Sequence, residues 1–269
     1  MLVNGVLSDT ISASDRGLLY GDGVFRTMLA TNGVIRHWSL HFLKLQRDCA
    51  ALQLSCPSAD TLQVEIEQAL GTLREAVVRV TITRGSGARG YAMPAAIPPS
   101  RIVSVSQLPE YPSIHLESGG RLHLCRLRLS SQPRLAGIKH LNRLENVLAA
   151  SEWDDRTIAE GVLLDQNGNV VCGTRSNLFM RRGDVLATPD LSHCGVSGVM
   201  REWVLSRVAD LGLRAEVRDI RLDELAQADE VFLTNSVLGV WSVRELIDVA
   251  GWSDLSLGAR LRTMLETQA

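Results

Sequence analysis

Hydrophobic and polar positions follow two different periods over the first 110 residues. From 78 to 83 apolar and polar residues alternate, a period of two that predicts a half-buried strand. Asn32-Gly33 separates two apolar segments and predicts a two-residue hairpin turn. Ser39 and Ser58 precede apolar stripes with helical spacing, and both can cap a helix. The predicted elements are strands at 23–31, 34–37, 78–83 and 101–106, and helices at 39–54 and 58–73.

A second set of elements follows an interruption. Between 107 and 120 prolines and glycines break both patterns, which marks a domain boundary. Beyond it we expect a hairpin that turns at Asn167-Gly168 and a helix that stops at Gly212. The full set is strands at 121–129, 161–173 (the hairpin), 178–181, 185–188 and 230–234, and helices at 140–153 and 198–212. The sequence thus predicts a mixed α/β protein, with a small domain at 1–110, a linker at 111–120, a larger domain at 121–269 and a cleft between the domains.

Composition excludes several classes of protein. The 269 residues are 45% hydrophobic and 22% charged, which is typical of globular domains. A formal net charge of -2 does not indicate a surface that binds nucleic acid. No apolar run approaches the ~18 residues that a membrane span needs. The five cysteines contain no Cys-x-x-Cys pair, which favours a reducing compartment over a disulfide framework or a zinc site. We expect a cytoplasmic protein without a metal and without a nucleic-acid or membrane partner.

Lysine is rare in this chain, which narrows the search for amine chemistry. Of the 28 basic residues, only Lys44 and Lys139 are lysines. A lysine, unlike an arginine, can lose its proton and act as a neutral nucleophile. Lys139 is flanked by Ile138 and Leu141, and a partly desolvated pocket there would lower the pKa of its amine. The alternative is a lysine in the first turn of a helix whose ammonium reaches solvent.

Two segments of the second domain have features of an anion site. The turn before the predicted helix at 198 contains Gly198, where free backbone N–H groups and a small residue suit a phosphate. Residues 234–236 follow a buried strand, and their hydroxyls and N–H groups can add to the same site. The alternative for the first segment is an ordinary capped helix start.

Other polar residues permit either a binding role or a structural one. The glycine-rich loop at 84–91 carries Arg84, Arg89 and Tyr91, a set that suits carboxylate recognition. It lacks the ending of a P-loop, and it can equally be a solvated loop with incidental charges. His37 and His41 have the i,i+4 spacing of a metal pair, although capping or packing is the simpler explanation.

Several segments together resemble the fold-type IV pyridoxal-phosphate enzymes, the group that contains branched-chain aminotransferases, D-amino-acid transaminases and 4-amino-4-deoxychorismate lyases. The resemblance covers nearly the whole chain. Arg-Gly-Ser-Gly-x-Arg-Gly-Tyr combined with Gly-Ile-Lys-His-Leu-Asn-Arg-Leu is most similar to the lyases. The matching segments are 15–25, 41–45, 84–91, 137–145, 176–179, 198–201 and Asn235.

The resemblance implies a homodimer of two-domain chains with pyridoxal 5'-phosphate in the cleft. Lys139 matches the catalytic lysine that bonds to the cofactor aldehyde. The other positions that match cofactor contacts are Lys44, Cys172, Asn177, Gly198, Val199, Met200, Asn235 and Ser236. For the carboxylates of a small-molecule substrate we expect Arg84 and Arg89 first and then Arg26 and Arg175, with Tyr20 and Tyr91 lining the site.

Two positions depart from the pattern of the family. Lys44 stands where the family usually has an arginine that grips the phosphate, which keeps the charge and loses the bidentate fork. Cys172 stands where the family usually has a glutamate that pairs with the pyridine nitrogen, although a single buried cysteine usually only packs. A neutral thiol supports protonation of that nitrogen poorly, so we expect a bias toward elimination and against transamination.

The function implied by the resemblance is the elimination of pyruvate from 4-amino-4-deoxychorismate, which gives 4-aminobenzoate for folate biosynthesis. One alternative is a D-amino-acid or branched-chain aminotransferase on the same fold. Another is a binding protein that has kept the fold without the cofactor. Retention of Lys139 in a chain with two lysines argues against this last alternative.

Overall fold

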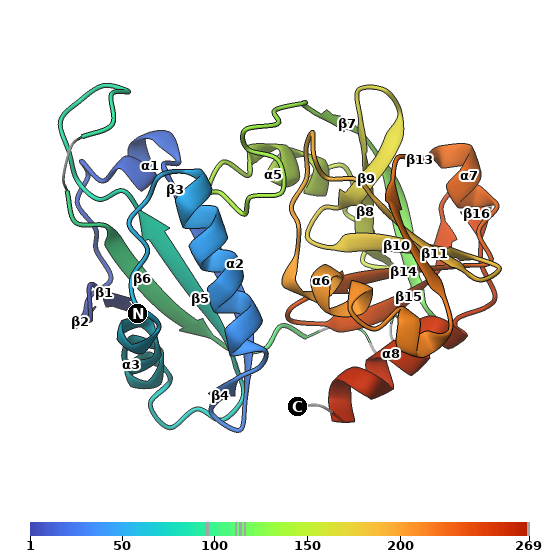
Figure 1. Ribbon diagram of the computed structural model, residues 1–269, viewed down its shortest axis with the longest axis horizontal. Helices are drawn as coiled ribbons and strands as arrows, with labels where there is room; N and C mark the ends of the chain where they lie inside the picture. The colour runs from blue at the N-terminus through green and yellow to red at the C-terminus, as the bar shows by residue number, and fades with distance from the viewer. Residues whose placement is uncertain (95–96, 111, 113–114, 116, 268–269) are drawn as a thin grey trace. The chain divides into compact units, whose positions relative to one another are not determined.

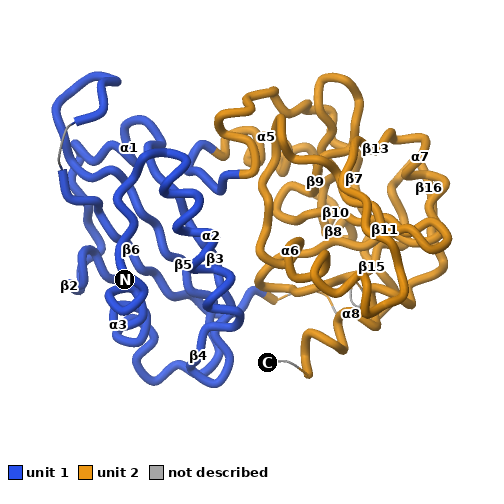
Figure 2. The backbone as a smooth tube through the Cα atoms, in the orientation of Figure 1, with its two compact units in different colours: residues 1–109, 138–142 blue, residues 110–137, 143–269 orange. Residues whose placement is uncertain are grey.

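The computed structural model describes residues 1–94, 97–110, 112, 115 and 117–267, which form a mixed α/β fold (Figure 1). The chain divides into two compact units, shown in blue and orange in Figure 2. The first unit is Met1–Pro109 with Ile138–Asn142, and the second is Glu110–Gly137 with Arg143–Ala269. Residues 111, 113–114 and 116 of the predicted linker lie outside the described residues. The domain boundaries predicted from the sequence do not anticipate that 138–142 belongs to the first unit.

The first unit is built on a six-stranded antiparallel sheet. Its elements are β1 (Leu2–Val3), β2 (Val6–Leu7), α1 (Arg16–Tyr20), β3 (Gly23–Thr31), β4 (Val34–Ile35), α2 (Trp38–Ala51), α3 (Ala59–Leu70), β5 (Ala76–Thr83) and β6 (Ser100–Ser106). The strand order is β2-β1-β6-β5-β3-β4. Helices α2 and α3 pack on this sheet (Figure 1), and their apolar stripes bury Leu45 and Leu62 in one core with Val24 and Met28 of β3.

Local signals in this unit are mostly confirmed. Asn32 and Gly33 have φ values of 55° and 80°, as a tight hairpin between β3 and β4 requires. The Ser58 hydroxyl accepts a hydrogen bond from the Thr61 N–H and caps α3. The predicted cap at Ser39 is wrong, because α2 begins at Trp38 after His37, which adopts a left-handed conformation with φ 54°.

Residues Ile138–Asn142, called the lysine strand below, form no strand of the sheet but pair with β3 through an isolated β-bridge. The Phe25 N–H donates to the Lys139 carbonyl over 3.0 Å, and the Leu141 N–H donates to the Gly23 carbonyl over 3.0 Å. These bonds flank an antiparallel bridge between Val24 and His140. The prediction of a helix over 140–153 is therefore wrong at its start. The helix is α5 (Leu144–Ala150), because the backbone groups before it form hydrogen bonds with β3.

The second unit is built on a ten-stranded sheet. In chain order its elements are β7 (Gly120–Leu129), α5, β8 (Ile158–Asp165), β9 (Asn169–Gly173), β10 (Asn177–Arg182), β11 (Val185–Pro189), α6 (Val199–Leu205), a 3-10 turn (Ala209–Leu211), β12 (Arg214–Arg218), β13 (Ile220–Arg221), α7 (Leu222–Ala226), β14 (Glu230–Asn235), β15 (Gly239–Leu246), β16 (Ala250–Gly251) and α8 (Ser256–Thr267). The strand order is β12-β11-β10-β14-β15-β7-β8-β9-β13, and β16 pairs with β15.

The predicted hairpin at Asn167-Gly168 joins β8 to β9 and is confirmed. The core of the second unit includes Leu178 and Met180 of β10 with Val231 and Leu233 of β14, which pair in register. In the described part of the chain no helix is long and apolar enough to span a membrane.

Candidate functional site

The backbone of Lys139 is held from two sides within the first unit. Its carbonyl accepts the hydrogen bond from Phe25 of β3, and its N–H donates to Oδ2 of Asp48 on α2 over 3.1 Å. The side chain turns toward Phe25, whose ring centroid lies 4.6 Å from Lys139 Nζ. The amine predicted to carry the chemistry is therefore attached to a strand whose backbone is bonded to both a sheet and a helix.

Two glycines of the 15–25 segment make room for the lysine strand. A Cβ at Gly23 would lie 2.5 Å from the carbonyl oxygen of Ile82 and 2.8 Å from the Leu141 side chain. A Cβ at Gly21 would lie 2.3 Å from Oδ1 of Asn142. At Gly23 the close backbone contact admits only a residue without a side chain. At Gly21 the contact is with the end of a flexible side chain, and the left-handed φ of 65° is what favours glycine. Gly23 therefore lets β3 lie close to both β5 and the lysine strand.

A buried charge cluster surrounds Asp48, which is 2% exposed. Its carboxylate forms ion pairs with Lys44, one turn earlier on α2, and with Arg26 of β3. Two cations and the Lys139 N–H thus share one carboxylate, which offsets the cost of burying these charges. The structure places Lys44 and Arg26, predicted to contact phosphate and substrate respectively, in this cluster.

His41 lies beside the same cluster and is 3% exposed. Burial, together with the positive charges of Arg26, His37 and Lys139, lowers the pKa of His41 to about 3. Its ring is therefore neutral at pH 7. Its Nδ1 atom is buried without a hydrogen-bond partner among the described residues.

Arg84 is committed to contacts with its own chain. Its guanidinium donates to both oxygens of Asp22, over 2.7 and 3.0 Å, and to the carbonyls of Leu52 and Gln53. Hydrogen bonds and charge from Arg84 and Arg16 hold the pKa of Asp22 below its usual value, against the opposing effect of burial. Arg84 therefore fixes the start of the glycine-rich loop and offers little to a ligand.

The rest of that loop lies against α1. The Gly90 N–H donates to the Tyr20 hydroxyl over 3.1 Å, and the rings of Tyr20 and Tyr91 lie 5.4 Å apart. Tyr91 is 87% exposed, and Arg89 is exposed as well. The structure thus brings Tyr20, Tyr91 and Arg89 to one exposed loop region of the first unit.

Arg79 is a candidate that the sequence reasoning missed. Its guanidinium carbon lies 3.9 Å from the centroid of the Phe25 ring, the ring over which Lys139 Nζ also lies. Arg79 is exposed and has no carboxylate partner among the described residues; its Nε donates weakly to Thr81 over 3.4 Å. Although the residue as a whole is exposed, the atoms packed around its guanidinium, among them the Phe25 ring, remove water from the group and lower its pKa; it stays charged at pH 7. In the sequence Arg79 is only one polar residue of an alternating strand, and its pairing opposite Thr27 on β3 requires the sheet register.

In the second unit Asn177 organises the turn before α6. Its side-chain amide donates to the Val196 carbonyl over 2.7 Å, and its Oδ1 accepts from the Gly198 N–H over 2.9 Å. A Cβ at Gly198 would lie 2.3 Å from that Oδ1. The glycine is therefore required by Asn177, whereas the sequence suggested that it admits a phosphate. The side chains of Val199 and Met200 are buried, so these residues offer their backbone N–H groups.

Thr234 lies directly opposite Asn177 on the neighbouring strand, so both side chains project from the same face. Thr234 is 1% exposed, and its hydroxyl has no hydrogen-bond partner among the described residues. A buried hydroxyl without a partner is costly unless something else binds it. Asn235 uses its Oδ1 to accept from the Val237 and Leu238 N–H groups, so it shapes the turn that carries the half-buried Ser236.

Cys172 lies in an apolar cluster with Cys125, Leu163 and Leu191, and it is 6% exposed. Burial, with smaller contributions from Cys194 and Glu160, raises the pKa of its thiol to about 12. The thiol is therefore neutral at pH 7.

Arg175, a predicted substrate contact, lies next to a buried carboxylate. Its backbone N–H donates to Glu160 over 2.6 Å, and its guanidinium lies 3.6 Å from the same side chain. Burial raises the pKa of Glu160 despite these contacts. The Arg175 guanidinium also donates to the Ala159 carbonyl over 2.8 Å. Arg175 is therefore tied to the first residues of β8.

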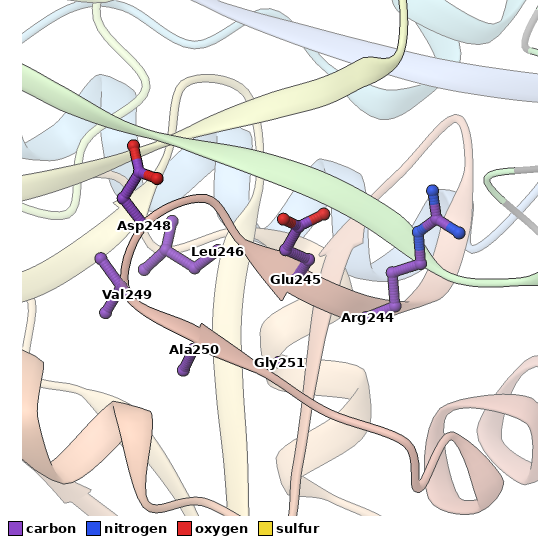
Figure 3. Close-up of a pocket in the computed structure, with 7 residues that line it drawn as sticks. All are labelled: Arg244, Glu245, Leu246, Asp248, Val249, Ala250 and Gly251. Carbon is purple, nitrogen blue, oxygen red and sulfur yellow. The ribbon is translucent and has the colours of Figure 1, made fainter.

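A surface pocket of about 540 Å³ lies elsewhere in the second unit (Figure 3). It is lined by Arg244, Glu245, Leu246, Asp248, Val249, Ala250 and Gly251. These residues are at the end of β15 opposite to Gly239, which pairs with Asn235. Glu245 is already paired with Arg121 over 2.6 Å. None of the residues that line the pocket belongs to the candidate site. Within the described ranges no three His, Cys, Asp or Glu side chains gather as a metal site.

Known families and proteins resemble this chain over most of its length. Residues 23–246 match the model of the family described as amino-transferase class IV. An aminodeoxychorismate lyase of Vibrio harveyi is 34% identical over 262 residues, covering 97% of each chain. The crystal structure of 4-amino-4-deoxychorismate lyase from Pseudomonas aeruginosa has a TM-score of 0.94 and 43% identity, and the match covers 99% of this chain and 98% of that one. A D-alanine aminotransferase of Bacillus licheniformis is 26% identical over 256 residues, covering 91% of this chain and 88% of the relative. The chain therefore belongs to the class IV aminotransferase family, the fold-type IV enzymes.

Proposed function

We propose that this protein is a lyase that eliminates pyruvate from 4-amino-4-deoxychorismate and releases 4-aminobenzoate, with pyridoxal 5'-phosphate as cofactor. The observation that carries the proposal is the position of Lys139. This chain matches aminodeoxychorismate lyases over nearly its full length, and one of its two lysines lies on a strand that is fixed by β3 and Asp48. A lysine held in this way suits covalent attachment to an aldehyde.

The residues present suit the cofactor. The Thr234 hydroxyl is a buried polar atom without a partner, next to a turn whose N–H groups at Val199 and Met200 begin a helix. We assign the phosphate to these groups and to Ser236, with Asn177, Gly198 and Asn235 shaping the two turns. When bound, pyridoxal phosphate supplies an aldehyde for amines and a ring that accepts electrons. Lys44 is paired with Asp48, and we assign it to the surroundings of Lys139 rather than to the phosphate.

The chemical steps assigned to this chain centre on Lys139. Its amine takes the proton from the substrate carbon that bears nitrogen, acting as a general base at short range. Loss of the enolpyruvyl group from the neighbouring carbon then makes the substrate ring aromatic, which drives the reaction. The protonated Lys139 returns its proton to the departing enolpyruvate.

We assign one substrate carboxylate to Arg79, because its guanidinium and the Lys139 amine lie over the same Phe25 ring. Arg89 is the second candidate, with Tyr91 on the same exposed loop and Tyr20 next to that loop at the end of α1. The ion pairs of Arg84 and Arg26 support structural roles for these two residues.

Cys172 favours elimination over transamination in this scheme. Its neutral thiol offers no carboxylate to hold a proton on the ring nitrogen of the cofactor. Transamination depends on that proton more than elimination does, because in elimination the electrons leave with the departing group. An aminotransferase is the alternative, since D-alanine aminotransferases are also among the relatives.

We further propose that the protein is a cytoplasmic homodimer. Leu144, Val147 and Leu148 on α5 are 68%, 62% and 52% exposed, a cluster at helical spacing that suits an interface. Light scattering of the purified protein would measure its mass directly.

The decisive test is incubation of wild type and Lys139→Ala with 4-amino-4-deoxychorismate. We expect pyruvate release from wild type and a loss of about a thousandfold or more in the variant. Borohydride reduction of the wild-type holoenzyme should attach the cofactor mass to the peptide that contains Lys139. Equal rates in the two proteins would contradict the proposal, and amino transfer from D-alanine to a 2-oxo acid without pyruvate release would favour the alternative.

A further inference from the structure

Asp48 connects Lys44, one turn earlier on its own helix, with two groups that lie far from it in the sequence. Its Oδ1 faces Lys44, and its Oδ2 faces both Arg26 and the backbone N–H of Lys139. Lys44 and Asp48 belong to α2, Arg26 to β3 and Lys139 to the lysine strand. One buried carboxylate therefore joins a helix, a sheet and the strand that carries the amine.

Packing of α2 does not by itself require a carboxylate at this position. The neighbouring buried residues Leu45 and Cys49 are apolar and belong to the core of the first unit. A buried ion pair is often no more stabilising than an apolar side chain of similar size, because both charges must leave water. The hydrogen bond that Asp48 accepts from the Lys139 N–H is the feature that an apolar residue could not supply.

That hydrogen bond completes the restraint of the Lys139 backbone. The N–H of Lys139 belongs to the peptide group before its Cα, and the C=O belongs to the peptide group after it. Asp48 holds the first peptide group at 3.1 Å, and the Phe25 N–H holds the second at 3.0 Å. With both peptide planes fixed, the backbone dihedrals of Lys139 are fixed too, and only side-chain torsions place its Nζ.

We propose that Asp48 is a positioning residue for Lys139: it fixes the backbone of the lysine through its N–H and is itself held in place by Lys44 and Arg26. The inference rests on the role proposed above for Lys139 as the cofactor lysine. It also gives Lys44 a function in this chain, because its ammonium keeps the Asp48 carboxylate directed at the lysine strand. Near-attack geometry of this kind contributes to rate through orientation.

The test compares Asp48→Ala and Asp48→Asn with a matched control, Glu65→Gln. Glu65 is also a buried helical carboxylate of the first unit, 5% exposed, but its partner is Arg101. The first readout is amide hydrogen exchange across residues 138–142. The second is the rate at which the apoenzyme captures pyridoxal 5'-phosphate on Lys139, trapped with borohydride and measured by mass spectrometry.

We expect Asp48→Ala to raise exchange at the Lys139 amide about tenfold or more, because a hydrogen bond to a charged acceptor is lost. We expect the rate of cofactor capture to fall about tenfold, because the backbone from which the Lys139 amine extends is no longer held in one conformation. Asp48→Asn keeps an acceptor oxygen but loses the charge that strengthens the hydrogen bond and holds Lys44 and Arg26, so it should change both readouts in the same direction by a smaller factor, about threefold. Glu65→Gln should leave exchange in the lysine strand within about twofold of wild type, even if the variant loses stability.

Two outcomes would overturn the inference. One is wild-type exchange and capture in Asp48→Ala. The other is a Glu65→Gln variant that changes both readouts as much as Asp48→Ala, which would reduce Asp48 to a general stabilising residue. If Asp48→Ala does not fold, wild-type values for Asp48→Asn in both readouts overturn it equally. Absence of pyruvate release from wild type would contradict the proposed reaction alone, because neither readout depends on that substrate.

Discussion

Arg79 and Lys139 lie over the same aromatic ring, that of Phe25, with their terminal groups 3.9 and 4.6 Å from its centroid. Arg79 reaches this position from β5 and Lys139 from the lysine strand, on either side of β3 in the sheet. An arginine without a carboxylate partner, over the ring that the proposed catalytic amine also contacts, is suited to bind an acidic substrate.

We therefore expect Arg79→Gln to raise the KM for 4-amino-4-deoxychorismate by about 10- to 100-fold with a much smaller change in kcat, because a charge-assisted hydrogen bond to a substrate carboxylate is lost. Steady-state pyruvate release measures both constants. Arg74→Gln, at an exposed arginine of the turn before β5, is the control and should behave as wild type. An unchanged KM in Arg79→Gln, with a raised KM in Arg89→Gln, would move the carboxylate site to the loop.

Thr234→Val should affect the apoprotein and the holoenzyme in opposite directions. The substitution keeps the volume and removes a buried hydroxyl without a partner, so the Tm of the apoprotein should stay equal or rise. The Kd for pyridoxal 5'-phosphate should increase about tenfold if that hydroxyl binds the phosphate.

Thr188→Val is the matched control in the same unit. The Thr188 hydroxyl is equally buried but donates to the Leu178 carbonyl over 2.8 Å. This variant should lower the Tm of the apoprotein and leave the cofactor Kd nearly unchanged. A Thr234→Val protein that binds the cofactor as wild type does would remove Thr234 from the phosphate site.

Cys172→Glu should introduce aminotransferase side activity, because a carboxylate can keep the ring nitrogen of the cofactor protonated. It should also lower the Tm of the protein, since position 172 is buried in an apolar cluster. Spectral conversion of the cofactor by D-alanine measures the new activity. Cys172→Ser keeps a neutral side chain and should gain none; a Glu variant that is folded and equally inactive in transamination would argue against this role of the thiol.

His41 should make the first unit less stable in mild acid. Its pKa is about 3 in the folded protein and 6.5 in the reference state, so the unfolded chain binds more protons between these values. Stability from this group is therefore complete above pH 6.5 and is lost as the pH falls toward 3, by about 2 kcal/mol between pH 6.5 and 4.5.

Urea unfolding of wild type and His41→Gln at both pH values measures this loss. The variant should lose less stability on acidification than wild type, whereas His193→Gln, at an exposed histidine, should lose as much as wild type. Parallel losses in all three proteins would assign the acid sensitivity to other groups.

Sequence patterns predict those parts of the fold that depend on nearby residues. The hairpins at Asn32-Gly33 and Asn167-Gly168 and the cap at Ser58 are confirmed, because each is decided by a few neighbouring residues. The start of the predicted helix at 140 is wrong, because pairing with β3, more than a hundred residues earlier, overrides local preference there.

The same limit applies to the candidate site. Lys139 is identifiable because lysine is rare and its motif is distinctive, whereas Asp48, Arg79 and Thr234 depend on partners that only the fold brings near. Arg84 has a prominent place in its motif, yet its donors are taken by Asp22 and two carbonyls. Residue type and spacing do not tell a committed guanidinium from an available one.

The lysine strand also determines how this protein can be dissected. A fragment that ends at Pro109 would retain β3 but leave the backbone groups of Gly23 and Phe25 without the partners that Leu141 and Lys139 provide. An uncovered strand edge of that kind pairs readily with other chains and promotes aggregation. An independently expressed first unit would therefore need residues 138–142 grafted back through a designed tether.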